Sequence, residues 1–353
     1  MKEKLSRLDW TDVFLWLIGA SIVALVVIGS IATLADNKYT SRQWFDFFIF
    51  GIAQGSVYAL IALGYTLVYG ILRMINFAHS EVYMSGAFSG YFIATGLARS
   101  GFLDSNPILG LVMVFAVAMT VSTVIAILLE RIAYRPLRRA PRLVPLITAI
   151  GASFFLQYTF RGLFGSQNRA YPEMSIFDTS WTIAGGLVIN PVQVLVIVAA
   201  SILMIGLYLF VQYTRTGKAM RAVSEDKDVA ALMGIDVDGI IVRTFALGAA
   251  LAGAAGVLYA LMFRQVSFFM GFVPGIKAFT AAVLGGIGNI PGAMLGGVFL
   301  GIFESVGPTL FLEGLNIPAA HQLKDVIAFT LLVLILIFRP TGILGEKLTK
   351  AKA

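Results

Sequence analysis

The sequence holds 353 residues, 58% of them hydrophobic and only 13% charged, with a mean hydropathy of +0.87. A soluble core cannot bury so much apolar surface, so the composition predicts a membrane protein. The lack of cysteine excludes a disulfide framework, a thiol nucleophile and a thiolate-bound zinc site. Two histidines, His79 and His321, are a poor basis for any metal centre.

Apolar runs between breaks predict ten membrane-spanning helices. In chain order they cover about residues 12–35, 46–72, 82–98, 108–130, 143–164, 190–213, 241–266, 274–288, 291–311 and 324–338. The strands of a membrane barrel would be about ten residues long and would alternate in polarity, whereas a stretch such as 192–210 is apolar all round. We therefore expect an all-α polytopic membrane protein, in which two of the ten helices are broken or short.

The first apolar run follows Lys2, Lys4 and Arg7, as the apolar part of a secretory signal would. Its length, residues 12–35, exceeds the about 7–15 apolar residues of such a signal. The run ends in Ala32-Thr33-Leu34-Ala35, which is not a clean A-x-A cleavage site. We expect an uncleaved helix.

Basic residues are distributed unevenly over the two ends of the predicted helices. Of 26 lysines and arginines, 18 fall on the side that holds both termini and eight on the other. The larger group comprises Lys2, Lys4, Arg7, Arg73, five arginines in 131–142, five cations in 215–243, Arg339, Lys347, Lys350 and Lys352. Because lysine and arginine resist translocation, we expect both termini to be cytoplasmic. Topology accounts for the net charge of +7, and no nucleic-acid partner is expected.

Two segments, 51–81 and 277–301, contain the glycine, proline and asparagine residues that predict helices broken inside the membrane. Backbone freed at such breaks survives only when it is buried in protein or lines a wet cavity, so paired breaks indicate a substrate path. Polar side chains in hydrocarbon also need partners. The candidate substrate-path residues are Gln54, Tyr58, Asn76 and Asn289.

Several residues in these segments have two interpretations. The glycines at 292, 296, 297 and 301 are better explained as small-residue faces for close helix packing than as part of the path. His79 and Glu81 are candidate gate residues, or they form a solvated or capping helix end. Glu304, alone in an apolar span, is a proton site or makes a packing hydrogen bond.

The loop after the sixth span, residues 214–240, has an amphipathic pattern. Its apolar residues can gather on one face of a helix that Gly234 ends, and they are Ala222, Val223, Val229, Leu232 and Met233. A short exposed helix of this kind suits docking in a groove of a partner protein. A helix lying on lipid is the alternative, but residues 225, 226 and 228 are acidic and the loop lacks Trp and Phe.

Three stretches of the sequence resemble one known family. They run from Gly55-Ser-Val-Tyr-Ala-Leu to Asn76-Phe-Ala-His79, from Gly217-Lys-Ala-Met-Arg221-Ala through Gly234-Ile to Gly256, and over Ala281-Ala-Val-Leu-Gly-Gly-Ile-Gly-Asn-Ile-Pro-Gly-Ala-Met-Leu-Gly-Gly. They are similar to the permease subunits of ABC importers for branched-chain and other neutral amino acids, in particular the H-type membrane subunit. The resemblance implies an extra helix in 1–45, a permease domain in 46–345 with the coupling loop 214–240, and a cytoplasmic tail in 346–353.

The resemblance also implies partner proteins. Two homologous permeases, usually different ones, form the pore in the plasma (inner) membrane of a prokaryote, with two cytoplasmic ATPases and an extracytoplasmic solute-binding protein. This chain would be a transport subunit without enzyme activity or cofactor, and ATP would bind the ATPases, since no G-x-x-x-x-G-K-[ST] motif is present and Gly217-Lys218 is the nearest approach. The implied ATPase-coupling residues are Arg221, Glu225, Val229, Leu232 and Gly234.

Other solutes and other classes of protein stay open at this point. Relatives that carry urea or short amides share the family pattern. A secondary transporter or channel would also have broken helices and an intramembrane Glu304, but would need no partner loop. An intramembrane protease would need a G-x-S-G turn paired with histidine, and Gly151-Ala-Ser153-Phe lacks both the last glycine and a histidine in its own or an adjacent span.

Overall fold

The computed structural model of the chain describes residues 10–138, 140–141, 143–174, 177, 181–183, 187–339 and 341–345. The predicted cytoplasmic tail, 346–353, and residues 1–9 lie outside the described residues. The long helices are α2 (Trp10–Ala35), α3 (Ser41–Leu72), α4 (His79–Arg99), α6 (Pro107–Leu129), α7 (Leu143–Phe164), α8 (Pro191–Tyr213), α11 (Val237–Phe263), α12 (Phe272–Gly285), α13 (Ile290–Gly307) and α14 (Lys324–Phe338). Short helices are α5 (Phe102–Ser105), α9 (Arg215–Glu225) and α10 (Lys227–Leu232).

Tight helical turns and short strands complete the described structure. The turns are η1 (Glu130–Tyr134), η2 (Arg135–Leu137), η4 (Pro308–Leu312), η5 (Glu313–Leu315) and η6 (Ala320–Leu323). The strands β1 (Arg169–Ala170) and β4 (Gln265–Val266) pair antiparallel, as do β2 (Trp181–Ile183) and β3 (Leu187–Ile189).

Each of the ten predicted spans coincides with one long helix, which confirms the predicted fold class. Within the described residues, eight helices are long and apolar enough to cross a membrane. The two remaining long helices are α12, which has only 14 residues, and α4, which is more polar. A helix needs about 20 apolar residues to cross the hydrocarbon alone, so α12 depends on its neighbours for its place in the bundle.

Local sequence signals set the starts of the helices that later frame the candidate site. At the start of α3, Thr40 Oγ1 accepts a hydrogen bond from the Gln43 amide, and Gln43 Oε1 accepts one from the Thr40 amide. At the start of α8, Asn190 Oδ1 accepts from the Val192 amide, and Pro191 occupies the first helical position. These caps hold the ends of α3 and α8 in fixed positions.

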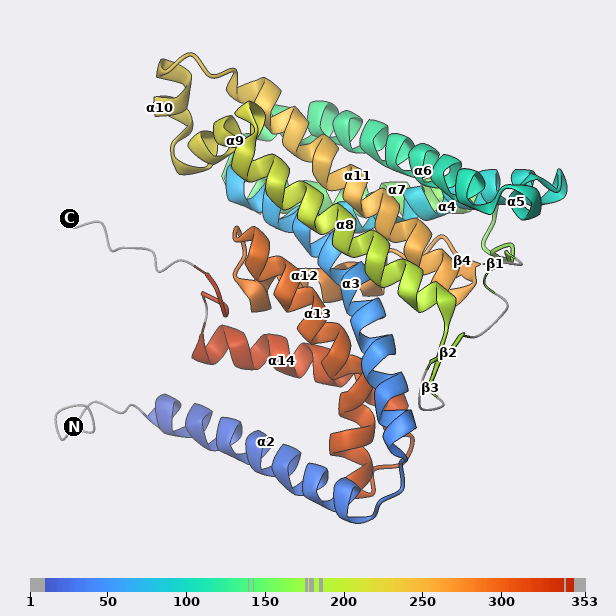
Figure 1. Cartoon of the computed structure of the whole chain (residues 1–353). Coiled ribbons are helices and arrows are strands. Elements are labelled where there is room, and N and C mark those ends of the chain that lie inside the picture. The colour runs from blue at the N-terminus through green and yellow to red at the C-terminus, as the bar shows by residue number, and fades with distance from the viewer. Residues whose placement is uncertain are drawn as a thin grey trace.

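Helix α3 lies at the centre of the bundle, packed against α13, α12, α11 and α8 (Figure 1). Helix α11 is as enclosed as α3 and packs on α4 and α6. Helix α2 lies at the periphery, where it packs on η4 and η5 (Figure 1). The first predicted span is therefore a helix, and its main contacts with the rest of the described chain are those with η4 and η5.

Glycines create the close contacts between α3 and α13. A methyl group on Gly301 would collide with the backbone of Gly55, and one on Gly297 would collide with the backbone of Ala59. This arrangement confirms the packing interpretation of the α13 glycines.

The two predicted breaks fall between helices. Helix α3 continues without interruption to Leu72, and the break occupies residues 73–78, where Arg73 adopts a left-handed conformation with φ of 55°. The second break occupies residues 286–289 between α12 and α13. A Cβ built on Gly70 would lie 3.9 Å from the Cα of Gly288, so the two breaks are neighbours.

The loops predicted to be cytoplasmic gather at one end of the bundle. Arg73 donates a hydrogen bond to the Ser224 carbonyl at 3.3 Å, and Arg135 pairs with Asp238 at 2.7 Å. The start of α2, the end of α14, and α9 and α10 lie toward the same side in Figure 1, and the four strands lie toward the other. We call these the α9–α10 end and the strand end. Which end faces the cytoplasm stays a prediction.

Candidate transport path

A buried polar network joins four helices. The Gln54 side-chain amide donates to the Tyr58 hydroxyl over 2.5 Å, and both residues belong to α3. The ammonium of Lys277, on α12, lies 5.9 Å from the centre of the Tyr58 ring. It forms an ion pair with Glu304 on α13 and another, at 2.6 Å, with Asp325 at the start of α14.

The centre of this network is nearly dry, since Lys277 and Glu304 are each only 3% exposed, whereas the Asp325 side chain is 43% exposed. Charges so deeply enclosed are tolerated only when they are paired. Glu304 stands out in the sequence as a charge in an apolar span, and Lys277 carries the matching signal, a cation inside another apolar helix, which was missed. The bond from the Lys277 ammonium to the Glu304 carboxylate joins α12 to α13, so Glu304 does make a hydrogen bond between packed helices, and its role as a proton site stays a prediction.

A cavity of about 430 Å³ reaches this network from the strand end. That volume lies in the range of about 300–1,000 Å³ that is typical of ligand pockets. The lining residues are Asp46, Phe47, Phe50, Gln54, Gln193, Glu304, Ser305, Pro308, His321 and Lys324. Gln54 lies thirteen residues into α3, about 20 Å along the helix axis, so the cavity extends well into the bundle. We call it the inner cavity.

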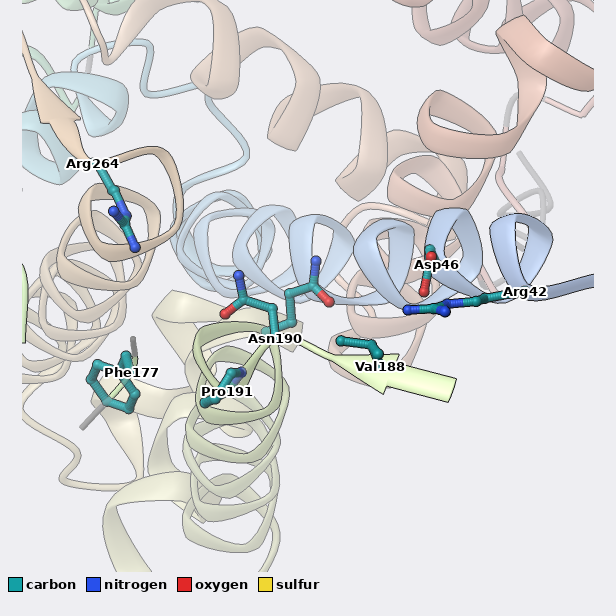
Figure 2. Close-up of a pocket in the computed structure, with 8 residues that line it drawn as sticks. Arg42, Asp46, Phe177, Val188, Asn190, Pro191 and Arg264 are labelled. Atoms are coloured by element: carbon teal, nitrogen blue, oxygen red, sulfur yellow. The ribbon is translucent and has the colours of Figure 1, made fainter. Parts of the chain in front are cut away.

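A second cavity of about 360 Å³ shares Asp46 and Gln193 with the first. Figure 2 shows its wall, with Arg42 and Asp46 on α3, Asn190 at the start of α8 and Arg264 just after α11. Its charged residues belong to helix ends at the strand end of the bundle. The two cavities together form a charged mouth above a deeper and partly aromatic pocket.

Two predicted path residues lie far from this pocket. The Asn76 side-chain oxygen accepts a hydrogen bond of 2.5 Å from the Tyr134 hydroxyl, and both side chains are buried. Asn289 caps α13 by accepting from the Gly292 amide at 2.8 Å, and its amide nitrogen donates to the Leu344 carbonyl at 3.0 Å. The structure brings Gln54 and Tyr58 together but places Asn76 and Asn289 at the breaks near the α9–α10 end.

The candidate gate residues are enclosed by protein. The His79 ring packs edge-on against Tyr65, with ring centres 5.1 Å apart. Glu81 is completely buried and accepts hydrogen bonds from Gln157 at 2.7 Å and from Ser153 at 3.1 Å. A solvated helix end is therefore the wrong interpretation for both residues. Their gating role stays a prediction.

The amphipathic loop folds into two helices rather than one. Asp226 separates α9 from α10 and caps α10 by accepting from the amides of Asp228 and Val229. As a result, the predicted single apolar face does not form. Val223, on α9, is buried within the chain, whereas Val229 and Leu232, on α10, are 54% and 86% exposed.

The other residues of the loop are arranged around this exposed apolar patch. Arg221 donates to the Gln212 side chain at 2.8 Å, and Glu225 is exposed. Gly234 has a φ of +82°, as expected for a residue that stops a helix. Burial, followed by the charges of Arg138 and Arg73, lowers the pKa of Lys227. Charged residues of both signs thus lie beside the exposed apolar residues of α10, since Asp228 acts on Lys227 in the opposite direction.

Comparison with known proteins gives one consistent family. The sequence model described as the permease component of branched-chain amino acid transport systems matches residues 47–336. The high-affinity branched-chain amino acid transport system permease protein BraD of Pseudomonas aeruginosa is 48% identical over 298 residues, 84% of this chain and 94% of the relative. The corresponding LivH of Escherichia coli K12 is 42% identical over 312 residues, 87% of this chain and 96% of the relative.

A more distant relative is the probable branched-chain amino acid transport permease protein LivM of Methanocaldococcus jannaschii, 30% identical over 146 residues, 38% of this chain and 41% of the relative. No solved structure gives a significant match. The family match covers every long helix except α2. The chain therefore belongs to the family of permease components of branched-chain amino acid transport systems.

Proposed function

We propose that this chain forms part of the membrane path of an ATP-driven importer for branched-chain amino acids. The observation that carries the proposal is the 48% identity to a permease of that class over 94% of the relative's length. The inner cavity supports it, because Phe47 and Phe50 offer apolar surface beside the charged Glu304 and Lys324. An aliphatic amino acid has the same combination of an apolar side chain and two charges.

The partners follow from this role. A second, homologous permease completes the pore, and the similarity of this chain to a LivM-type permease supports pairing between related subunits. Two ATPases dock at the α9–α10 end, which is then cytoplasmic, and a solute-binding protein delivers the amino acid to the strand end. The exposed Val229, Leu232 and Met233 supply the apolar contact for the ATPase.

The test is reconstitution in liposomes of this chain with the second permease, the two ATPases and the solute-binding protein encoded by neighbouring genes. Radiolabelled leucine should accumulate only when ATP and the binding protein are both present, and excess isoleucine or valine should compete. Uptake of labelled urea in place of leucine would show that the proposed solute, a branched-chain amino acid, is wrong. Leucine uptake by this chain without any ATPase would show that the proposed class, an ATP-driven importer, is wrong.

A further inference from the structure

The inner cavity presents three kinds of chemistry to whatever occupies it. Glu304 contributes a carboxylate from α13, Lys324 contributes an ammonium from the start of α14, and Phe47 and Phe50 contribute aromatic surface from α3. These are the complements of the ammonium, the carboxylate and the apolar side chain of an aliphatic amino acid. The cavity is therefore matched to a zwitterion, and not only to an apolar solute.

Glu304 is prepared to accept a further donor. Its Oε1 atom is paired with Lys277, whereas its Oε2 atom is buried and accepts no hydrogen bond within 3.5 Å in the described part of the chain, although the Tyr58 hydroxyl lies near the carboxylate. A buried carboxylate oxygen without a donor is costly, so an N–H group from a ligand would relieve that cost. Asp46 also lines the cavity, but it is exposed at the mouth, where water already solvates its charge.

The charge balance around Lys277 points the same way. Its single ammonium is shared between the carboxylates of Glu304 and Asp325. Asp325 is 43% exposed and partly solvated, so Glu304 is the enclosed carboxylate of the two, and an added ammonium beside it is favoured over an added anion. Lys277 acts as a positioning residue, because its ion pair holds one oxygen of Glu304, while the other oxygen is buried next to the cavity that Glu304 lines.

We propose that Glu304 and Lys324 bind a zwitterionic aliphatic amino acid in the inner cavity. The α-ammonium of the amino acid donates to Glu304 Oε2, its α-carboxylate pairs with Lys324, and its side chain packs on Phe47 and Phe50. The inference rests on the proposed transport function and adds to it a binding site within the permease itself. Because Glu304 is buried and Lys324 is exposed, the ammonium contributes more to recognition than the carboxylate.

The test uses the assembled transporter with Ser305→Cys in this cysteine-free chain, since Ser305 lines the cavity. The rate of modification by a methanethiosulfonate reagent is measured with leucine, with isoamylamine, which lacks the carboxylate, and with 4-methylpentanoate, which lacks the ammonium. Leucine should protect the thiol. Protection by 4-methylpentanoate should need at least about tenfold more ligand, as for a buried charge partner, and isoamylamine about two- to fivefold more, as for an exposed one. Ser100→Cys, exposed away from the cavity, should not be protected.

Two further variants separate recognition from packing. Glu304→Gln should make leucine and 4-methylpentanoate equally protective, and Lys324→Gln should make leucine and isoamylamine equally protective. Asp36→Asn and Lys38→Gln remove the charges of an exposed ion pair at the same end of the bundle, 3.3 Å apart, and should leave all ratios unchanged.

Uniform weakening of protection by every ligand in both variants would mean that Glu304 and Lys324 only support the fold, and would overturn the site. If the Glu304→Gln transporter fails to assemble, the Lys324→Gln variant still tests the site, because it should abolish the difference in protection between leucine and isoamylamine. Leucine uptake by the Ser305→Cys transporter without protection of the thiol would reject the site and leave the transport function intact. Protection of the thiol by leucine without leucine uptake would support the site and reject the proposed transport function.

Discussion

Asn76 shows why a polar residue in a membrane protein need not line a transport path. Its side-chain oxygen is satisfied by the hydroxyl of Tyr134, which lies 58 residues further along the chain and is completely buried. An amide with such a partner no longer carries the full cost of burial. Gln54 has a partner too, Tyr58, but that pair adjoins a cavity.

The Tyr134–Asn76 contact predicts a stability effect. Tyr134→Phe removes the hydroxyl and leaves a buried acceptor without a donor, which should lower the free energy of unfolding by about 1–3 kcal/mol. The measurement is thermal unfolding of the purified permease in detergent. Tyr158→Phe is the matched control, because Tyr158 is 59% exposed, and it should leave the midpoint unchanged. Equal midpoints for the two variants would show that the Tyr134 hydroxyl does not stabilise the fold through Asn76.

Pairs of helices approach each other where glycine permits it. On the face that α13 turns toward α3, Gly297 and Gly301 meet the backbone of Ala59 and Gly55. Such contact lets polar groups on the two helices meet, and it brings Glu304 close to Tyr58 on α3. The glycines therefore contribute to the candidate site without touching any solute.

Alanine substitution tests this contact against intrinsic helix propensity. Alanine favours a helix over glycine by about 1 kcal/mol, so Gly206→Ala, where a Cβ meets nothing within 4 Å, should be neutral or stabilising. Gly301→Ala should instead lower the unfolding temperature, because its methyl group would force α13 away from the backbone of Gly55. Fluorescence-detected size exclusion after heating measures both. A more stable Gly301→Ala variant would contradict the close approach.

The second helix of the 214–240 loop, α10, is predicted to couple transport to ATP hydrolysis. Leu232→Asp would place a charge in a dry groove of the ATPase, at a cost of a few kcal/mol, or about a hundredfold in affinity. ATPase co-purification and leucine uptake should both fall. Leu232→Met keeps the surface apolar and is the control. Undiminished co-purification with Leu232→Asp would show that α10 does not dock.

Gly234→Val tests the same coupling through the backbone. Valine resists the positive φ of +82° at this position, so the chain between α10 and α11 should rearrange. Uptake should fall. The backbone strain should lower the free energy of unfolding by no more than about 1–3 kcal/mol, because a Cβ at Gly234 would meet no atom within 4 Å and adds no clash. A larger loss of stability in the isolated permease would assign Gly234 to folding instead.

Orientation is a property of the whole chain, and single cysteines test it. The uneven distribution of cations predicts that the α9–α10 end faces the cytoplasm. Glu225→Cys should resist an impermeant thiol reagent in intact cells, and Ser166→Cys should react, since both positions are exposed. Met174, in the same loop as Ser166, is only 3% exposed and would be a poor reporter. Labelling at 225 together with protection at 166 would show that the α9–α10 end faces away from the cytoplasm.

Helix limits and family membership could be predicted from the sequence because both depend on local patterns. An apolar run long enough to cross a bilayer must be a helix, since the backbone finds no other partners in lipid. Residues such as Thr40 and Asn190 mark helix starts through contacts within three positions. Motifs of contiguous residues likewise identified the family that the comparisons confirmed.

The pairing of buried polar groups could not be predicted in this way. Lys277, Glu304 and Asp325 come from three helices, and Gln54 joins them from a fourth. Their meeting depends on how each helix is rotated and how closely it packs, which is the combined result of many contacts along whole interfaces. For the same reason Asn76 and Asn289, which had the same local signature as Gln54, lie at a different end of the molecule.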